Sequence, residues 1–392
     1  MVELSVNFLG MHFPNPFLLA SAPPTANTQM ILDGFSHGWG GAVIKTIGLE
    51  PTRNPCPRVH IIKESRTKTG MVNIELISEW GLAQWLDGIS EIRRRFPDRP
   101  LIASIMGGAD PHDWQEVVRQ LEPRGISAFE MNVSCPNFAA ERGAQLGQDP
   151  QSLGKAVRWV REATRLPVIV KLTPNVTDIT GLAKVAKESG ADAVTATNTL
   201  SGLGGIDLQT FQPQPAVDGL GIFGGYSGSG LKPVALRCAA AIARTVDIPI
   251  IGGGGIHRWQ DAAEFISVGC SLVEVCTAVM WNGFGILDQL TRGLSDYLEQ
   301  QELPSLKELA GKALPFLVQY PDLNIIRRLL AEVDLIKCNG CAICEKACTS
   351  GGYQAIRMED EKAVIDPVRC DGCGLCEGVC PTDAIRMVIK SV

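Results

Sequence analysis

Eight of the thirteen cysteines of the chain lie in two runs of identical spacing near its C-terminal end. Each run has the pattern Cys-x₂-Cys-x₂-Cys-x₃-Cys, and the second begins 32 residues after the first. Proteins that hold two [4Fe–4S] clusters use this spacing, and there the fourth cysteine of each run binds the other cluster. The pattern predicts one cluster bound by Cys338, Cys341, Cys344 and Cys380 and a second bound by Cys370, Cys373, Cys376 and Cys348.

A zinc module is the alternative to iron–sulphur clusters. Zinc needs a single tetrahedral set of four ligands, usually from two separated Cys-x₂-Cys pairs, so two complete four-cysteine runs favour the clusters. Thr349 stands where the motif has proline after Cys348, but this proline is not a ligand. A pair of clusters implies that electrons move singly, so we expect a flavin elsewhere in the protein.

Eight short apolar runs alternate with segments of helical periodicity between residues 15 and 280. Most of these runs are continuously apolar, as parallel strands buried on both faces require. They are 17–23, 41–48, 101–107, 128–134, 167–174, 193–199, 249–256 and 272–279. Eight such units predict an α/β fold of the (β/α)₈ barrel type, and a doubly wound open sheet is the structural alternative.

The same patterns divide the chain into three parts. We expect a barrel over residues 1–300, a helical connector over 301–333 and a ferredoxin-like domain over 334–392. Two long segments, 49–80 and 200–230, are expected to be loops. Because barrel enzymes carry their chemistry at the C-terminal ends of the strands, these loops should cover the catalytic mouth.

Charge and composition exclude several classes of protein. The net charge is −6 and no stretch is dominated by lysine and arginine, so nucleic-acid binding is not expected. The first residues lack the pattern of a secretory signal, and no apolar run reaches the ~20 residues that span a bilayer. We expect a cytoplasmic protein with no membrane segment, in a reducing compartment where cysteines serve as ligands rather than disulfides.

Reactive side chains follow several of the predicted strands. Lys171 follows an apolar Val-Ile-Val run, Asn198 and Thr199 end another strand, and Cys135-Pro136 comes just after a third. A single cysteine in such a place is more often a buried structural thiol than an acid or a nucleophile. A lysine, an asparagine–threonine pair and a cysteine at the same expected end of a barrel favour a catalytic site.

The motifs around these residues resemble the dihydroorotate/dihydropyrimidine dehydrogenase family of FMN-binding barrels. The resemblance covers roughly residues 5–295 and rests on NVSCPN (132–137), VKLTPNVTDI (170–179) and TATNTLSG (195–202). The stretches NIELISE (73–79) and VTATNT (194–199), together with the cysteine-rich tail, are similar to the dihydropyrimidine dehydrogenase branch. Asn137 departs from that branch, which usually has histidine there.

The resemblance implies a role for each matching residue. Cys135 would be the general acid at C5 of a pyrimidine ring while the flavin delivers hydride to C6, and a thiol with a pKa of ~8.5 suits both directions. Side-chain amides pair with both N–H and C=O groups of such a ring. The substrate contacts implied are Asn73, Glu75, Asn132, Ser134, Asn198 and Thr199.

The resemblance also implies where FMN binds. A fixed ammonium near the flavin ring stabilises the negative charge of its reduced form, and Lys45 and Lys171 match the lysines of the family. Ala20, Ser21 and Thr46 match residues beside the flavin. The phosphate site implied is Gly228, Gly254, Gly255, Cys276 and Thr277, where backbone N–H groups are accessible.

No nicotinamide-binding fingerprint accompanies these motifs. The glycine clusters at 224–230 and 252–255 do not open a βαβ unit with an acidic residue ~20 positions further on. We therefore expect a partner subunit that carries FAD and NAD(P), in a homo- or hetero-oligomer. Residues 331–392 hold ten acidic and seven basic residues, so the partner's docking face should be basic and its association salt-sensitive.

Three functions fit the sequence. The first is reversible reduction of uracil or thymine to the 5,6-dihydro form. The second is oxidation of dihydroorotate or another cyclic amide, for which an added basic contact to the substrate carboxylate is expected. The third is electron transfer without catalysis, in which case replacing Cys135 would leave the function intact.

Overall fold

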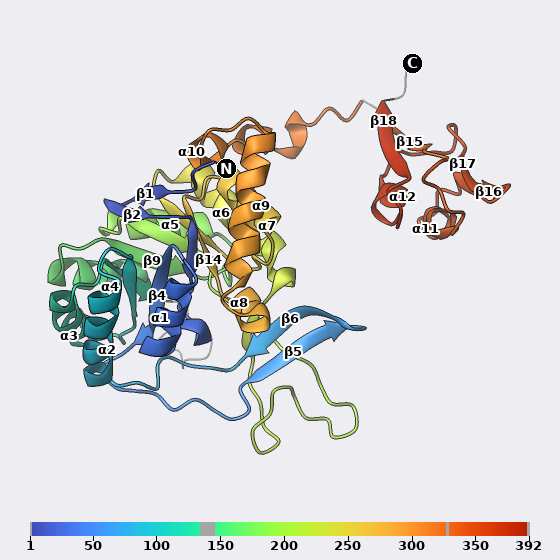
Figure 1. The fold of residues 1–392 in the computed structure, drawn as a ribbon. Helices are drawn as coiled ribbons and strands as arrows, with labels where there is room; N and C mark the ends of the chain where they lie inside the picture. Colours follow the sequence, from blue (N-terminus) through green and yellow to red (C-terminus); the bar gives the residue numbers. More distant parts are fainter. Residues whose placement is uncertain (1, 134–145, 327–328, 390–392) are drawn as a thin grey trace. The chain divides into compact units, whose positions relative to one another are not determined.

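The computed structural model describes residues 2–133, 146–326 and 329–389. The chain folds as two compact units, Met1–Phe316 and Leu317–Val392, and Figure 1 shows their elements. The second unit begins inside the segment expected as a connector. That segment contains the short helix α10 (Leu306–Leu309), two 3₁₀ turns (Leu314–Phe316 and Tyr320–Asp322) and then a strand of the second unit.

The first unit is a closed barrel of eight parallel strands. All eight apolar runs are strands of this barrel, so the prediction of a (β/α)₈ barrel is confirmed and the open sheet is excluded. In chain order, which is also their order around the barrel, the strands are β3 (Phe17–Leu19), β4 (Gly41–Ile47), β7 (Leu101–Ile105), β8 (Ala128–Asn132), β9 (Val168–Leu172), β10 (Ala193–Ala196), β13 (Ile250–Gly253) and β14 (Leu272–Val275).

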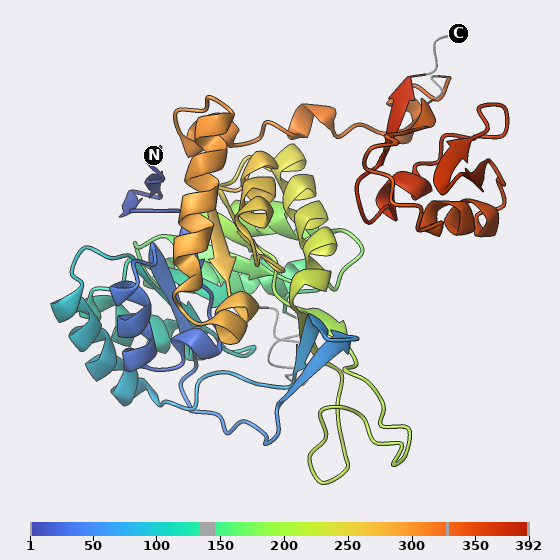
Figure 2. The same ribbon diagram turned by 45° about the vertical axis from the view of Figure 1, so that its right-hand side comes forward.

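Helices surround the barrel, as two views show (Figures 1 and 2). Three of them begin at an aspartate whose carboxylate accepts a hydrogen bond from a free N–H of the first turn: Asp110, Asp149 and Asp178. The helices are α1 (Thr28–Ser36), α2 (Leu82–Arg95), α3 (Pro111–Leu121), α4 (Pro150–Ala163), α5 (Ile179–Glu188), α6 (Lys232–Thr245), α7 (Trp259–Ser267), α8 (Thr277–Asn282) and α9 (Ile286–Gln300).

An N-terminal hairpin packs against the interior of the barrel at the end where the strands begin. Its strands are β1 (Val6–Phe8) and β2 (Met11–Phe13). Phe8 and Phe13 pack in one cluster with an apolar residue from each barrel strand, among them Val43 of β4 and Ile169 of β9. This cluster fills the half of the barrel near the strand starts, so a ligand can enter only from the opposite end.

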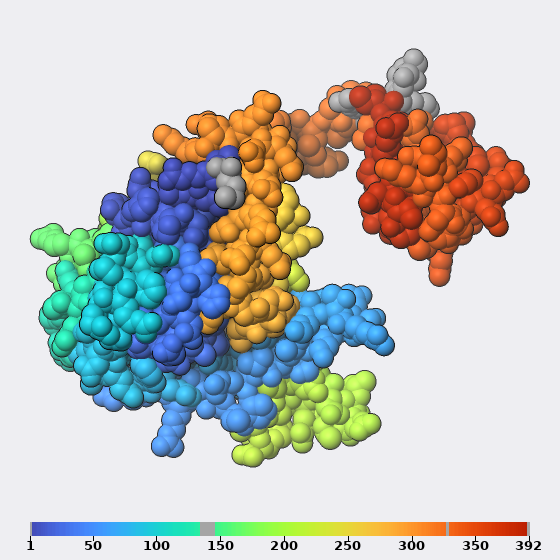
Figure 3. Space-filling model, viewed as in Figure 1, coloured from blue at the N-terminus to red at the C-terminus, as the bar shows by residue number. Residues whose placement is uncertain are grey.

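The two long segments expected to be loops are partly strands. They supply β5 (Val59–Glu64), β6 (Thr67–Asn73), β11 (Leu200–Gly202) and β12 (Gly224–Ser227), which pair in the order β11-β12-β6-β5 as one antiparallel sheet. Figures 1 and 3 show β5, β6 and the segment between β11 and β12 projecting from the barrel. The loop prediction was wrong here. The pairing of β6 with β12 joins segments about 150 residues apart and leaves no local signal, whereas β5 and β6 form a local hairpin that the prediction missed.

The second unit repeats one arrangement twice. The strand β15 (Leu329–Val333) pairs with β18 (Ile385–Ile389), and β16 (Ile356–Glu359) pairs with β17 (Lys362–Ile365). A short helix begins two residues after the second cysteine of each run: α11 (Ile343–Ser350) and α12 (Leu375–Gly378). Because β15 pairs with β18, the unit begins before residue 334.

The buried core of the second unit is small. Its buried members are two alanines, two isoleucines and the cysteines Cys344 and Cys376. A core of this size contributes little to stability. We therefore expect the unit to depend on whatever its cysteines bind. Within the described ranges, no helix of either unit has the length and apolar character needed to cross a membrane.

Candidate active site

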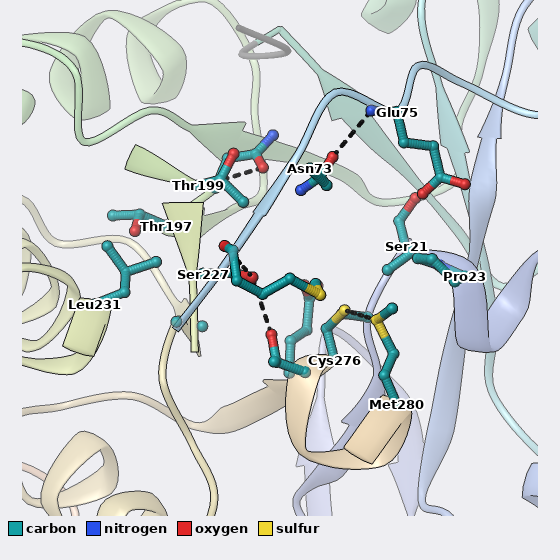
Figure 4. Close-up of a pocket in the computed structure, with 18 of the residues that line it drawn as sticks. Ser21, Pro23, Asn73, Glu75, Thr197, Thr199, Ser227, Leu231, Cys276 and Met280 are labelled. Carbon is teal, nitrogen blue, oxygen red and sulfur yellow. Dashed lines mark hydrogen bonds between the residues drawn. The ribbon is translucent and has the colours of Figure 1, made fainter. Parts of the chain in front are cut away.

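A cavity of about 1090 Å³ opens at the C-terminal ends of the barrel strands. Figure 4 shows its walls, with Ser21 and Asn73 on one side and Leu231 on the other. Fourteen residues predicted for the flavin or the substrate line this one cavity. They are Ala20, Ser21, Lys45, Thr46, Asn73, Glu75, Asn132, Lys171, Asn198, Thr199, Gly254, Gly255, Cys276 and Thr277.

The other predicted residues lie elsewhere. Gly228 is at φ +99° just before α6, next to the lining residue Ser227, and does not itself line the cavity. Ser134 and Cys135 lie outside the described residues. They follow Asn132, the last residue of β8, by two and three positions.

The floor of the cavity follows from the alternation of side chains along the strands. The apolar cluster inside the barrel takes one residue from each strand, such as Ile169 of β9. Side chains two positions further on face the same way. This next layer is the floor of the cavity, and it is mostly polar and lies directly above the apolar cluster. It consists of Ala20, Lys45, Ser104, Glu130, Lys171, Thr195, Gly253 and Glu274.

Lys171 is buried between two carboxyl groups of this floor. Its Nζ lies 2.5 Å from Oε2 of Glu274 and 3.4 Å from Oε1 of Glu130. Burial opposes the charge, but the two carboxyl groups outweigh it and raise the pKa of Lys171. Lys171 is therefore an ammonium group at the working pH.

A second lysine is paired at the wall of the cavity. Lys45 of β4 lies 3.0 Å from Glu75, whose other carboxylate oxygen lies 3.3 Å from Nε of Arg58. Glu75 follows β6, so the sheet at the mouth brings it over the barrel. The wall thus carries one carboxylate between two cations.

Hydroxyl and amide groups connect the strands around the floor. Thr46 Oγ1 lies 3.1 Å from the hydroxyl of Ser21 and 2.9 Å from that of Ser104. Asn132 donates to Thr46 Oγ1 at 3.0 Å, and Asn198 donates to Asn132 Oδ1 at 3.4 Å. Three asparagines from three segments, the third being Asn73, therefore face one space where they can bind a flat amide ring.

The far wall is formed by glycines and short side chains. Gly254 and Gly255 have φ values of +115° and +84°, and a Cβ on Gly255 would lie 2.6 Å from the backbone nitrogen of Lys232. Thr277 Oγ1 lies 3.1 Å from Oγ of Ser227. Only glycine fits this backbone, and the resulting surface exposes main-chain groups suited to a phosphate.

The cavity also contains polar atoms that the described residues leave unsatisfied. Oγ1 of Thr197 and Nε2 of His257 are buried and have no hydrogen-bond partner in the described part of the chain, and both residues line the cavity. Unsatisfied buried polar atoms are costly, so the cavity is suited to a polar ligand. Its lysines, backbone N–H groups and asparagines are the kinds of donor that FMN and a flat amide ring require.

Cys276 faces Met280 near the floor (Figure 4). Its Sγ lies 3.7 Å from the methionine Sδ, and burial raises the pKa of Cys276 to about 11. The group stays a neutral thiol near pH 7. It interacts electrostatically with Lys45 and Lys171.

Several residues around the cavity were not predicted. Glu130 and Glu274 each interrupt an otherwise apolar strand, Ala-Phe-Glu-Met-Asn and Leu-Val-Glu-Val. A charge in the middle of a buried strand was the signal that marked them. Thr197, Ser227 and His257 had no comparable signal. Thr197 and His257 lie after strands β10 and β13, Ser227 ends β12, and all three stand among small and polar residues.

The cysteines of the second unit surround two separate cavities. One, of about 300 Å³, is lined by Cys338, Cys341, Cys344 and Cys380. The other, of about 340 Å³, is lined by Cys348, Cys370, Cys373 and Cys376. Each set takes three cysteines from one run and the fourth from the other.

The surroundings of the two cysteine sets match. The N–H of Ala355 donates to Cys348 Sγ at 3.3 Å, and the N–H of Ala384 donates to Cys380 Sγ at 3.2 Å. Within the described ranges, no three Cys, His, Asp or Glu side chains converge as a single metal ion requires. Sulphurs spread around a cavity suit a cluster of several irons rather than zinc.

Each of the two units matches a known protein family. Residues 3–298 match the family described as dihydroorotate dehydrogenase, and residues 331–387 match the 4Fe-4S dicluster domain. The chain is 37% identical over 364 residues to the NAD-dependent dihydropyrimidine dehydrogenase subunit PreA of Escherichia coli (strain K12), covering 92% of this chain and 88% of that protein.

Two other relatives are informative. The chain is 36% identical over 337 residues to the chloroplastic dihydropyrimidine dehydrogenase (NADP(+)) of Arabidopsis thaliana, covering 82% of this chain and 79% of that protein. It is 38% identical over 315 residues to the catalytic subunit of dihydroorotate dehydrogenase B (NAD(+)) of Pyrococcus furiosus, covering 80% of this chain and 99% of that protein. This relative is matched over almost its whole length, whereas about a fifth of this chain lies outside the match.

Proposed function

The chain belongs to the dihydroorotate dehydrogenase family, and we propose that within it this protein is a dihydropyrimidine dehydrogenase, an oxidoreductase that acts on CH–CH bonds. It interconverts uracil or thymine and the 5,6-dihydro ring. One observation carries the proposal: a flavin-family barrel with three asparagines around one cavity is joined to a unit with eight cysteines around two cavities.

We assign FMN to the cavity of the barrel. Lys45, Lys171, Ala20, Ser21 and Thr46 would hold the flavin ring, and Gly228, Gly254, Gly255, Cys276 and Thr277 would hold the phosphate end. When bound, FMN exchanges a hydride with C6 of the pyrimidine. The ammonium of Lys171 offers a fixed positive charge for the electron-rich form of the ring.

The remaining residues of the site would bind and protonate the substrate. Asn73, Asn132 and Asn198 would present amides to the flat edges of the pyrimidine, and Glu75 and Thr199 line the same cavity. Ser134, outside the described residues, is a further proposed contact. Cys135 gives a proton to C5 during reduction and takes it back during oxidation. Two [4Fe–4S] clusters would be held by Cys338, Cys341, Cys344 and Cys380 and by Cys370, Cys373, Cys376 and Cys348, and would supply one-electron transfer.

The electrons require a partner. We propose a reductase subunit that holds FAD and NAD(P) and docks through a basic surface, because residues 331–392 carry a net negative charge. Clusters held by thiolates also favour a reducing compartment, so we place the complex in the cytoplasm. NADH- or NADPH-dependent uracil reduction should appear only when both subunits are present and should weaken as salt is added.

The second candidate is a dihydroorotate dehydrogenase, favoured by the identity to the Pyrococcus furiosus relative. A substrate that carries its own carboxylate needs a basic contact, and the two cations at the wall, Lys45 and Arg58, both pair with Glu75. Anaerobic mixing of the purified oxidised protein with dihydrouracil or dihydroorotate separates the two. Faster flavin bleaching by dihydrouracil supports the proposal, and faster bleaching by dihydroorotate overturns it.

A further inference from the structure

The floor of the cavity holds two carboxyl groups for one ammonium group. Glu130, Glu274 and Lys171 have side chains that are at most 9% exposed. The ammonium can neutralise only one carboxylate. If all three groups were charged, one negative charge would remain in a desolvated place, which is costly.

The two carboxyl groups use their oxygens differently. Glu130 directs Oε1 to Lys171 and accepts a hydrogen bond on Oε2 from Thr195 Oγ1 at 2.8 Å. Glu274 directs Oε2 to Lys171, whereas its Oε1 is buried and receives no hydrogen bond from any donor in the described ranges. Oε1 of Glu274 is therefore the one oxygen of the pair with room for a proton.

The two carboxyl groups also lie against the same ammonium, through Oε1 of Glu130 and Oε2 of Glu274. Two ionised carboxylates in such a place repel each other, and a proton on one of them removes the repulsion. Burial, followed by repulsion from Glu130, raises the pKa of Glu274 to about 8.

The nearest other charges do not compensate the pair. Lys45 is engaged by Glu75 at 3.0 Å, and Glu75 is also bound by Arg58 at 3.3 Å. Cys276, which follows β14 directly, is a neutral thiol. The wall group of Lys45, Glu75 and Arg58 has one net positive charge, but the Arg58 side chain is 42% exposed and water screens its charge. The buried group of Glu130, Glu274 and Lys171 must therefore balance most of its own charge.

We propose that Glu130 and Glu274 share one proton, carried on Oε1 of Glu274, and act as a positioning pair that holds the ammonium of Lys171 under the flavin at zero net charge. The part that concerns the flavin rests on the proposed function. With the proton present, the negative charge added by flavin reduction would meet the ammonium of Lys171, and the group of Glu130, Glu274 and Lys171 would have no net charge. Loss of the proton leaves the floor negative and opposes reduction.

The variant Glu274→Gln tests this directly. Its amide oxygen can accept from Lys171 and its NH₂ group can donate to Glu130, so it reproduces the protonated form. At pH 7 we expect FMN content and midpoint potential equal to the wild type. Above about pH 8 the wild-type potential should fall below that of E274Q, because only the wild type loses the proton.

The double variant Glu130→Gln/Glu274→Gln is the opposite case. It leaves Lys171 without a carboxylate, so the ratio of reduced to oxidised flavin at a fixed potential should rise about tenfold, equivalent to about 30 mV for a two-electron couple. The same rise in E274Q alone at pH 7 would show that Glu274 is ionised in the wild type, and the proposal would fail.

Infrared spectroscopy gives a readout that needs neither activity nor flavin. The wild type at pH 7 should show the carbonyl stretch of a protonated carboxyl group, and the band should disappear on raising the pH through about 8 to 10. It should be missing in E274Q. The control Glu264→Gln, in an exposed carboxylate 2.8 Å from Lys232, should keep it.

The two proposals fail in different ways. A wild type that contains no FMN contradicts the proposed function, yet the infrared band still decides whether the pair holds a proton. A wild type that contains FMN but lacks a titrating carbonyl band contradicts only the shared proton.

Discussion

The carboxylate of Glu75 lies 3.0 Å from the ammonium of Lys45, which joins the segment after β6 to strand β4 at the wall of the cavity. Arg58, at the foot of the same hairpin, lies 3.3 Å from the other carboxylate oxygen. The only carboxylate among the described wall residues above the floor is therefore fixed in place, and it sets the charge that an incoming ring meets.

We expect Glu75→Gln to change which ring binds. Removing the negative charge should strengthen binding of orotate, which carries a carboxylate, about tenfold relative to uracil. The affinities follow from the change in flavin absorbance on titration with each ligand. Glu79→Gln, in an exposed carboxylate of the same segment, serves as control and should alter neither ligand. Equal changes for both rings would show that Glu75 does not select by charge.

Asp261 of α7 organises the glycine-rich wall from behind. Its carboxylate accepts hydrogen bonds from the N–H groups of His257 and Arg258, both at 2.9 Å, and from Lys232 Nζ at 2.8 Å. Burial opposes its ionisation, but the hydrogen bond from Lys232 and those from the two backbone groups outweigh it and lower the pKa of Asp261.

We expect Asp261→Asn to loosen this wall and weaken FMN binding about tenfold. A carboxyl with a pKa below its unfolded value stabilises the fold above that value and loses the contribution as pH falls through the folded one. The wild type should thus hold FMN evenly from neutral pH down to about pH 4 and release it below. Fluorescence of the released FMN measures this, with Glu264→Gln as control. An unchanged dissociation constant in D261N would contradict the role.

The sequence predicted the barrel because buried parallel strands leave a local signature, a continuous apolar run such as Val168–Leu172. The ends of such strands predicted part of the cavity, since they must meet at one rim, and the family resemblance supplied other residues such as Asn73 and Glu75. Asn198 and Lys171 needed no tertiary information beyond the closure of the barrel.

What the sequence did not reveal depends on contacts between distant segments. Gly225 pairs with Asn73 across the sheet at the mouth, 152 positions away, and neither segment has an alternating apolar pattern. The interaction of Lys171 with Glu274 spans 103 positions. Each glutamate was visible as a charge in an apolar strand, but their shared partner became evident only when the barrel closed.

The arrangement of cysteines around the two cavities leads to a test of which residues bind each cluster. The wild type should contain about eight irons per chain, four in each cluster. If Cys348 binds with the second run, the double variant Cys348→Ala/Cys373→Ala loses one cluster and retains about four irons. Cys348→Ala/Cys341→Ala loses both clusters. The reverse pattern of iron content would show that each run binds its own cluster.

Loss of both clusters should affect the two units unequally. The second unit has a core of mostly alanine and cysteine side chains, so we expect it to unfold without iron, while the barrel keeps its FMN. Circular dichroism with flavin fluorescence follows the two events in one sample. Cys56→Ala, at an exposed cysteine of the first unit, is the matched control and should leave iron content and both transitions unchanged.

Cys135 distinguishes a catalyst from an electron carrier. Cys135→Ala removes the proton donor assigned to C5, so uracil reduction should fall by a factor of about 10² to 10⁴. Electron transfer from the reductase partner through the clusters to an artificial dye should continue at the wild-type rate, because no proton on the ring is involved. Cys135→Ser tests the pKa rather than the size of the side chain, and should also be slow, since a hydroxyl gives up its proton far less readily. If both variants reduce uracil as fast as the wild type, another group protonates the ring.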